Sequence, residues 1–485
     1  MGTASGQFHK TAENAPAGQA DYCTYFEIYG RYFDASEPAD KQYFVTTYRL
    51  YLGGDNIKDY NLLRNHAYTV NATLRGRNEV DMRVESVLNP ANCYMVSQPS
   101  TEYTFNATVM GNGALTPAPI SGSNKIMIVP KRLSPDGVML LWETGEAGDV
   151  IAPGSVKLSD DKRYISFRTS ATIGGNAVIA AMKNEQVIWS WHIWSTTYDP
   201  ETSYDTYVTR TINQSGYNSI PSREVRMMKV NLGATSLIST PGDLNCYGLY
   251  YQWGRKDPFI GRASVGTAME DVAFQTQTAK TTNAPGYEWR VGGFSGGTHE
   301  IRIAEAIAYP TYFAPMFNSI GDWITTEQNA GYDNLWGNPS ETGGYPNSSP
   351  GSKSIYDPCP SGWRVPRADT WTMFTTAGMP VTNASQINAA GGWNNGWYFY
   401  CMDTGSGPTA FYPAVGARNR GSGQIQFQSA YGVYWSSSPF NYKTEGLGFT
   451  KDVANPLVPN YSPFGVTRYF DCRATGNSVR CAKEE

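Results

Sequence analysis

The feature that most constrains the fold is a short-range alternation of apolar and polar residues. It is clear in segments 43–52 and 67–74, and similar runs recur along most of the chain. Successive side chains of a β-strand point to opposite faces of a sheet, so a period of two is typical of half-buried strands. Clusters of glycine and asparagine, such as 53–56 and 111–113, separate the runs and mark turns. We therefore expect a mainly β protein built from β-sandwich modules.

Helical periodicity is rare in this sequence. The best candidate is segment 367–377, which begins directly after Pro366, and a weaker one lies at 269–277. Proline fixes the backbone φ angle near its helical value and suits the first turn of a helix. Pro366 is therefore expected to end a strand and to begin a helix.

The composition excludes two classes of protein. Aromatic residues make up 13% of the 485 residues, which is too many for a chain that stays disordered. The formal net charge is −4, so no overall positive field attracts a phosphate backbone, and we expect no nucleic-acid partner. No apolar run approaches the roughly 18 residues of a membrane-spanning helix, so we expect no membrane-spanning segment.

Three regions follow from the composition along the chain, with domains of about 150 residues as the guide. Residues 1–90 contain a polar head followed by clear strands. Residues 91–198 have the strand density of an immunoglobulin-like β-sandwich without its disulfide, because only Cys93 lies inside. Residues 199–485 are richest in glycine and aromatic residues and have long loops. The strands expected in the middle region are 103–110, 125–129, 137–142, 164–169, 177–182 and 187–193.

The seven cysteines and four histidines do not indicate a zinc site. No two cysteines form a C-x-x-C pair and the histidines stand far apart, so we expect no metal and no cofactor. An odd number of cysteines leaves at least one thiol unpaired. A disulfide between Cys359 and Cys481 and a pair of buried free thiols are both compatible with the sequence.

The segment 51–76 contains a glycine-rich turn, then Arg64 and Asn65, then the alternating run 67–74. It is similar to the closing strands of fimbrillin domains of the Bacteroides type. This resemblance implies a partial fimbrillin-like β-domain at 1–90 and a chain that begins inside a domain. A missing N-terminal segment would then explain why the chain starts without the charged and apolar regions of a signal peptide.

The C-terminal region carries an ordered set of motifs. They are Y-G-L-Y-Y-Q-W-G-R-K-D-P at 247–258, I-Y-D-P-C-P-S-G-W-R-V-P at 355–366, Y-W-S-S-S at 434–438 and S-V-R-C-A-K at 478–483. The set resembles the Fibrobacter major paralogous domain. Its W-R-V-P-x-x-x-x-W segment is also similar to the fold of formylglycine-generating enzymes and C-type lectins. The resemblance implies an irregular α+β, C-type-lectin-like domain at 199–485.

In such a domain, large buried side chains hold long loops to a small sheet. Trp363, Trp371 and Trp435 are expected to do this, since each is large enough to bury about 200 Å². Arg364 and Arg480 are expected to bind loop carbonyls or a carboxylate.

The loop 391–398 is the best candidate for a ligand site, because it places tryptophans beside amides. An aromatic ring stacks on the apolar face of a sugar while asparagine bonds its hydroxyls. Trp393 and Trp397 are equally compatible with a role as core anchors. Under the sugar-binding hypothesis, Trp397→Ala weakens binding and leaves the fold intact. The candidate ligand-binding residues are Trp393, Asn394, Asn395, Trp397, Tyr398, Asp403, Arg418 and Asn419, with Arg420 beside them.

The function implied by the two resemblances is adhesion. We expect a fimbrial (pilus) tip or accessory subunit at the cell surface, in the fimbrium or outer membrane. Its partners are other pilus subunits, joined by strand exchange, and a host glycan or protein receptor. We expect no catalytic residues.

Two other functions stay open. A glycan-binding outer-membrane lipoprotein of a polysaccharide-utilisation system has the same aromatic and amide chemistry. An enzyme of the formylglycine-generating type needs a reactive pair, for which Cys472 and Cys481 are the candidates. A glycosidase needs two opposed carboxylates, which the sequence does not pair among its candidates Asp257, Glu305, Asp322 and Asp333.

Overall fold

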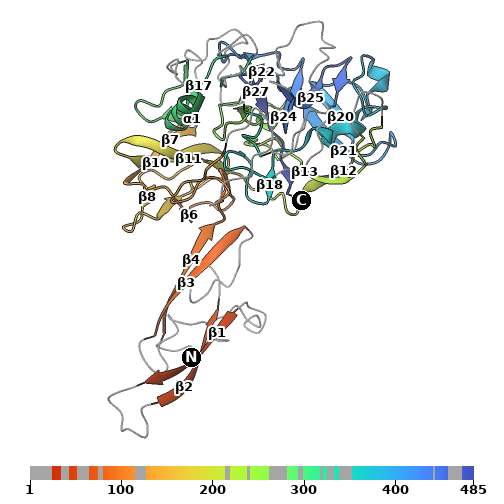
Figure 1. Ribbon diagram of the computed structural model, residues 1–485. Coiled ribbons are helices and arrows are strands. Elements are labelled where there is room, and N and C mark those ends of the chain that lie inside the picture. Colours follow the sequence, from red (N-terminus) through yellow and green to blue (C-terminus); the bar gives the residue numbers. More distant parts are fainter. Residues whose placement is uncertain are drawn as a thin grey trace. The chain divides into compact units, whose positions relative to one another are not determined.

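The protein is mainly β, as predicted (Figure 1). It divides into two compact units, Met1–Asn89 with Tyr103–Asn106, and Pro90–Glu102 with Ala107–Glu485. No helix within the described ranges is long and apolar enough to cross a membrane. The computed structural model describes residues 25–33, 43–51, 65–74, 80–114, 127–213, 219–237, 241–261, 281–292, 299–316, 321–324, 332–337, 352–440, 443–456 and 472–484.

The first unit contains two antiparallel hairpin pairs. Strand β1 (Tyr25–Phe33) pairs with β2 (Tyr43–Tyr51) over its whole length, and β3 (His66–Leu74) pairs with β4 (Val80–Leu88) in the same way. Strand β4 also runs parallel to β6 (Glu102–Asn106). The alternating segments 43–52 and 67–74 are therefore strands. The turn expected at 53–56 and the helix expected at 269–277 lie outside the described residues.

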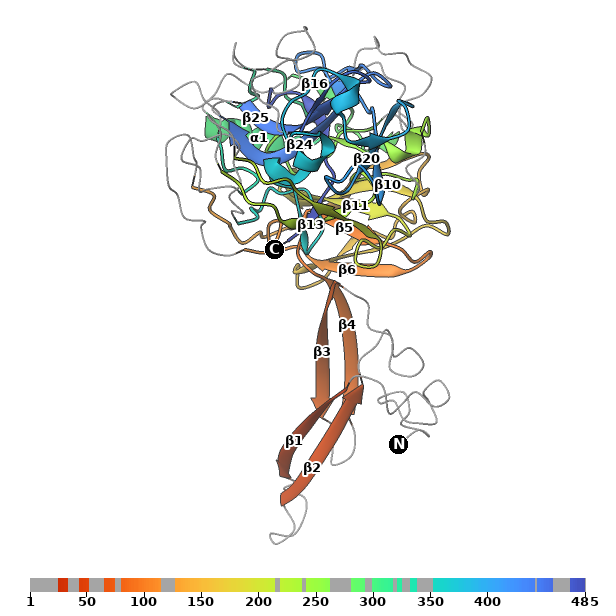
Figure 2. The same ribbon diagram turned by 90° about the vertical axis from the view of Figure 1, so that its right-hand side faces the viewer.

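The second unit begins with a five-stranded sheet in the order β15-β7-β10-β11-β5. In its centre, β10 (Gly175–Lys183) pairs antiparallel with β7 (Gly137–Thr144) on one side and with β11 (Gln186–Ser195) on the other. At the edges, β5 (Cys93–Val96) runs parallel to β11, and β15 (Thr281–Asn283) runs antiparallel to β7. The views in Figures 1 and 2 place β10 and β11 side by side.

The turn between β10 and β11 explains why this hairpin forms. Lys183 pairs with Gln186, so only two residues make the turn. These two, Asn184 and Glu185, have φ angles of 48° and 63°. Two successive positive φ angles give a turn whose twist matches that of the strands, and asparagine tolerates this conformation better than most residues.

Most strands expected in the middle region are present. Segments 137–142, 177–182 and 187–193 lie inside β7, β10 and β11, and 164–169 corresponds to β9 (Tyr164–Arg168), which pairs with β8 (Lys157–Leu158). The run expected at 103–110 is shorter than predicted, since β6 ends at Asn106. Of the run expected at 125–129, residues 127–129 are not a strand, and residues 125–126 lie outside the described residues.

The remaining sheets of the second unit consist mostly of short strands, in the orders β12-β13-β28-β18, β23-β22-β27-β24-β25-β26 with β14 on β27, β19-β20-β21 and β16-β17. Their bounds are β12 (Tyr204–Val208), β13 (Glu224–Met228), β14 (Tyr250–Gln252), β16 (Arg290–Val291), β17 (Tyr312–Phe313), β18 (Trp363–Arg364), β19 (Ala389–Ala390), β20 (Gly396–Tyr400), β21 (Thr409–Pro413), β22 (Ala417–Arg418), β23 (Ile425–Gln426), β24 (Gly432–Phe440), β25 (Lys443–Phe449), β26 (Ala454–Asn455), β27 (Gly476–Ser478) and β28 (Ala482–Lys483).

The helices differ from expectation in type and number. The segment after Pro366 does leave strand β18 and enter a helix, but it is the 3₁₀ helix η5 (Ala368–Phe374). Two shorter 3₁₀ helices are η2 (Leu244–Cys246) and η6 (Ala384–Gln386). The α-helix α1 (His299–Ala308) was not predicted. Its first apolar residues alternate with polar ones, which resembles a strand.

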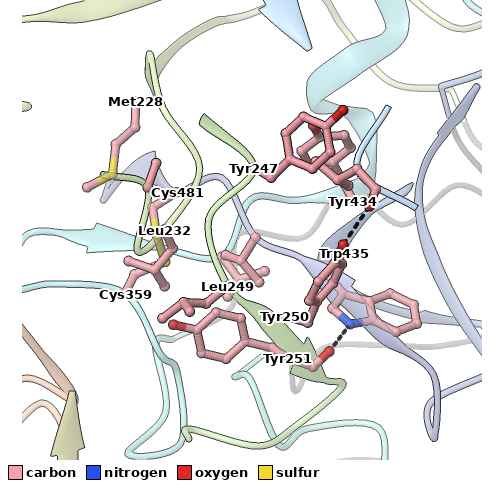
Figure 3. Packing of buried hydrophobic residues seen from close by; sticks show 14 of the residues in the cluster. Met228, Leu232, Tyr247, Leu249, Tyr250, Tyr251, Cys359, Tyr434, Trp435 and Cys481 are labelled. Carbon is pink, nitrogen blue, oxygen red and sulfur yellow. Dashed lines mark hydrogen bonds between the residues drawn. A yellow bond between two sulfur atoms is a disulfide. The ribbon is translucent and has the colours of Figure 1, made fainter. Parts of the chain in front are cut away.

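One hydrophobic core runs through the second unit. It joins Trp142 and Trp194 of the five-stranded sheet to Trp253 and Trp435 of the C-terminal sheets. The boundary expected at residue 198 therefore does not separate two cores. Figure 3 shows part of this core, where β14 packs beside Trp435 and the Cys359–Cys481 disulfide.

Candidate functional site

The motif residues hold one another in place through tryptophan side chains. The indole N–H of Trp435 donates to the carbonyl of Tyr251 at 2.6 Å (Figure 3), and that of Trp253 donates to the carbonyl of Ser436 at 2.9 Å. The segments 247–258 and 434–438 thus exchange side-chain to backbone hydrogen bonds. Both indoles are buried, so each ring contributes burial while its polar atom is satisfied.

The other two tryptophans of the motifs behave in the same way. Trp363 donates to the Glu201 carboxylate at 2.9 Å, and Trp371 donates to the Tyr412 hydroxyl at 3.0 Å. Their exposed fractions are 1% and 0%. The prediction that Trp363, Trp371 and Trp435 are structural anchors is confirmed.

Arg480 has the structural role expected of it. Its Nε donates to the side-chain oxygen of Asn231 at 2.9 Å, and its Nη1 donates to the Phe411 carbonyl at 3.0 Å. The guanidinium lies 3.9 Å from the centre of the Tyr412 ring and 5.9 Å from that of Tyr434. Two aromatic rings thus solvate a charge that is wholly buried.

The sequence left open whether Cys359 and Cys481 form a disulfide or are two buried free thiols. Cys359 and Cys481 form a disulfide, with a Cα–Cα distance of 6.1 Å. Cys472 is buried outside this disulfide, and its sulfur lies 3.0 Å from Nη1 of Arg420. The reactive pair of Cys472 and Cys481 that a formylglycine-generating enzyme needs is therefore not formed. Cys401 is also buried, and its burial raises the pKa of the thiol to about 12.

The loop 391–398 leads into the hairpin of β20 and β21. Gly396, with a φ of 151°, begins β20 where a Cβ atom would meet the Tyr412 carbonyl oxygen at 2.2 Å. Just before it, Asn395 has a φ of 52°, and its carbonyl accepts from the Ala414 N–H at 2.8 Å. The close approach of the two strands and this turn fix the backbone of the loop.

The loop presents one aromatic ring and two amides toward solvent. Trp393 and Asn395 are half-buried and Asn394 is exposed. The Trp393 ring makes edge contacts with Trp397 and Phe449, with centroids 5.7 and 6.2 Å apart. Trp393, Asn394 and Asn395 are therefore brought together as predicted residues of one surface.

Trp397 and Tyr398 lie behind that surface, in β20. Trp397 is only 6% exposed, and its indole N–H donates to the Thr450 carbonyl at 2.9 Å. Its face is covered by packing, so it supports Trp393 rather than offering a ring to a ligand. The expectation that Trp397→Ala leaves the fold intact does not fit this burial. Tyr398 is half-buried against Phe411.

The other three candidates lie elsewhere. Asp403 follows the far end of β20, a five-residue strand that spans on the order of 15 Å, and it pairs with Arg210. Arg418 is fully buried and donates to the Ile260 and Gly423 carbonyls, so it stabilises loops and has no surface for a ligand. Asn419 accepts from the N–H groups of residues 421 and 422 within its own turn.

Two of the four candidate carboxylates meet in the structure. Asp322 and Asp333 both contact Arg473, whose guanidinium lies 4.6 Å from the centre of the Trp253 ring. Burial raises the pKa of Asp322 to about 6, although Arg473 acts in the opposite direction. A glycosidase needs its carboxylates on opposite sides of a sugar, and here an arginine joins them instead.

A buried serine, lysine and aspartate form a closed hydrogen-bonded ring. The Lys256 ammonium donates to Ser190 Oγ at 2.6 Å, to the Ser190 carbonyl at 3.0 Å and to Asp257 at 2.7 Å, while the Ser190 hydroxyl donates to Asp257 at 2.6 Å. All three ammonium donors are used. Burial lowers the pKa of Lys256, whereas the carboxylate of Asp257 raises it, and the three hydrogen bonds commit this lysine to Ser190 and Asp257. Within the described ranges, no group of three potential ligands could hold a metal ion.

Comparison with known proteins yields one match. A family model described as a domain of unknown function (DUF4906) matches residues 2–72. No curated protein and no solved structure matches the chain. The match falls within the first unit. A function of the second unit must therefore be inferred from its geometry alone.

Sequence reasoning missed that Arg418, predicted as a ligand contact, faces inward. Loops with few ladder partners use its guanidinium to satisfy the carbonyls of Ile260 and Gly423. The one signal for this was the scarcity of long alternating runs after residue 199, which implies many backbone groups without strand partners.

Proposed function

We propose that this protein is a fimbrial tip or accessory subunit that acts in adhesion at the cell surface, with its second unit as the recognition head. The observation that carries the proposal is the surface of Trp393, Asn394 and Asn395, an aromatic ring beside two amides on a fixed loop. This is the chemistry that stacks and hydrogen-bonds a sugar. In this proposal the head binds a host glycan or a glycan-bearing protein and performs no chemistry of its own.

Three features support recognition over catalysis. Cys481 is consumed by a disulfide, and the Lys256 ring has no free donor to give up. The joined carboxylates Asp322 and Asp333 are buried behind Trp253 and Arg473. These candidates for acid–base or thiol chemistry are thus committed to structural partners.

Assembly by strand exchange is part of the proposal. In the part of the chain that the structure describes, β1 and β2 pair with each other as a two-stranded sheet. An isolated two-stranded sheet has two backbone edges and is marginally stable in water. A strand donated by another subunit would satisfy one such edge.

A glycan array and a cell-binding assay test the recognition surface. We expect Trp393→Ala and Asn394→Ala to reduce binding at least tenfold, because stacking and hydrogen bonding are both lost. The matched control is Tyr309→Ala, which removes another exposed aromatic ring, 43% exposed, from the same unit. Thermal unfolding of each variant shows whether the fold is kept. Binding that is unchanged in both loop variants would move the site elsewhere.

A further inference from the structure

A cavity lined by cationic side chains lies between three segments of the second unit. The room inside it for a water-sized group is about 20 Å³. The walls come from the start of β13, from β18 and the beginning of η5, and from β28 near the end of the chain. The residues that line it are Arg223, Val225, Arg364, Pro366, Arg367, Thr370, Ala482 and Lys483.

The lining is cationic although the chain as a whole is acidic. Three arginines and one lysine face this space, whereas the formal net charge of the protein is −4. Among the described residues that line the cavity, none is acidic. A general excess of basic residues therefore does not explain the cluster.

Carboxylates behind the lining hold the cationic groups in position. Asp369, whose side chain is fully buried, accepts from Nε and Nη2 of Arg223, both at 2.9 Å, and lies 3.4 Å from Nε of Arg367. The side chains of Arg223 and Arg367 remain 18% and 11% exposed. Asp369 thus orients two guanidinium groups that still reach the surface.

The other two cations are also supported from behind. Lys483 pairs with Glu201 and lies 5.3 Å from the centre of the Trp363 ring, with 29% of its side chain exposed. Arg364 acts electrostatically on the buried Asp357, whose carboxylate accepts from the Val365 and Cys359 N–H groups. Arg223, Arg367 and Lys483 are therefore held by carboxylates before any ligand arrives, which lowers the entropy cost of binding.

The size and chemistry of the cavity define what it can hold. The room inside it is only about 20 Å³, close to what one water molecule needs, so the site suits a single small group. Arginine forks bind carboxylate and sulfate oxygens in pairs, and Val225, Pro366 and Ala482 supply apolar walls.

We propose that this cavity binds an oxyanion, the carboxylate or sulfate of an acidic saccharide, through Arg223, Arg364, Arg367 and Lys483. The oxyanion follows from the cavity, whereas the saccharide rests on the proposed function. This site is formed by residues other than those of the 391–398 loop. Loss of glycan binding at one site can therefore be measured separately from loss at the other.

Calorimetric titration with three probes tests the proposal on the full chain. We expect sodium sulfate and N-acetylneuraminic acid to bind, with affinity that falls as the ionic strength rises, and N-acetylglucosamine to bind at least tenfold more weakly. Binding of sulfate alone would overturn the saccharide part and assign the site to a free inorganic anion. Failure of both anions to bind at millimolar concentration overturns the whole proposal, whatever the result for Trp393→Ala.

Variants place the binding in the cavity. We expect Arg364→Gln to weaken anion binding at least tenfold and Lys483→Gln about threefold, whereas Lys483→Arg keeps it. Arg163→Gln, at an exposed turn, makes the same charge change away from the cavity and serves as the control. If Arg364→Gln does not fold, the two Lys483 variants decide. Equal affinity in Lys483→Gln and the Arg163→Gln control contradicts the assignment.

Discussion

The five-stranded sheet and the C-terminal region 352–484 contribute to one core, yet they satisfy their backbone groups differently. Strands β10 and β11 pair along their whole length, so the ladder itself uses the N–H and C=O groups. In the C-terminal region many strands have two or three residues, and side chains serve instead. The Asn388 amide, for example, donates to the carbonyls of Met373 and Met402 at 2.7 Å.

The difference shows where single residues matter most. Loss of one buried side chain from a long ladder costs its packing and leaves the backbone bonds in place. Loss of a side chain that satisfies loop carbonyls also leaves buried acceptors without partners, at roughly 1–3 kcal/mol each. We therefore expect the C-terminal region to be the more sensitive of the two to polar substitutions.

The largest effect is expected for Arg480→Ala. The substitution leaves Asn231 and the Phe411 carbonyl without their donor and opens a cavity between Tyr412 and Tyr434. We expect the free energy of unfolding in urea to fall by about 4–5 kcal/mol. Arg480→Lys keeps the charge and should lose about half as much. An Arg480→Ala variant as stable as wild type would contradict this view of the region.

Removal of the disulfide is expected to have the next largest effect. Cys359 and Cys481 are 122 residues apart, and a crosslink that closes a loop of this length stabilises by about 4 kcal/mol, chiefly through the unfolded chain. Urea unfolding of the double variant Cys359→Ala/Cys481→Ala measures the loss. Cys401→Ala, which truncates a buried free thiol, is the control and should lose about 1 kcal/mol.

Asp322 should give the C-terminal core a pH dependence. Its pKa rises from 3.8 to about 6 on folding, so between these values the unfolded chain loses its proton while the folded chain keeps it. Stability is therefore highest below about pH 4 for this group and falls by about 3 kcal/mol as the pH rises to 6. Urea unfolding at several pH values measures this, and the difference between wild type and Asp322→Asn isolates it. A difference that does not vary between pH 4 and 6 would show that Asp322 keeps its usual pKa.

The smallest loss of stability is expected for a substitution in the five-stranded sheet. Ile179 is fully buried in β10, and its backbone pairs with Leu140 on one side and Trp191 on the other. Ile179→Val removes one methylene group and no hydrogen bond, so about 1 kcal/mol should be lost. A loss as large as that of Arg480→Ala would remove the distinction between the two regions.

The difference between long strand ladders and loops held by side chains also explains how much of the fold the sequence predicts. Strands β2 and β3 were predicted from the alternation of their residues, which is typical of a long ladder. Strands β7, β10 and β11 were predicted as well, although β10 and most of β11 are buried on both faces. The α-helix α1 was missed because its first turn alternates like a strand. In the C-terminal region the motifs identified the tryptophan anchors, but short strands leave no periodic pattern to read.

The candidate site was predictable only in part. A loop with Trp393, Asn394 and Asn395 carries its own chemical signature, whereas the burial of Trp397 depends on Thr450, far away in sequence. The joining of Asp322 and Asp333 depends in the same way on Arg473. Contacts between distant segments are set by the tertiary fold, and no spacing in one sequence reveals them.

The position of the last strands has a consequence for biogenesis. Strand β27 lies between β22 and β24, β28 lies between β13 and β18, and Arg480 and Cys481 stand between these two strands in the chain. Because synthesis proceeds from the N-terminus, the ribosome must deliver residue 483 before the second unit can close. Until then the long preceding segment lacks its central partners, which makes chaperones important for the nascent polypeptide.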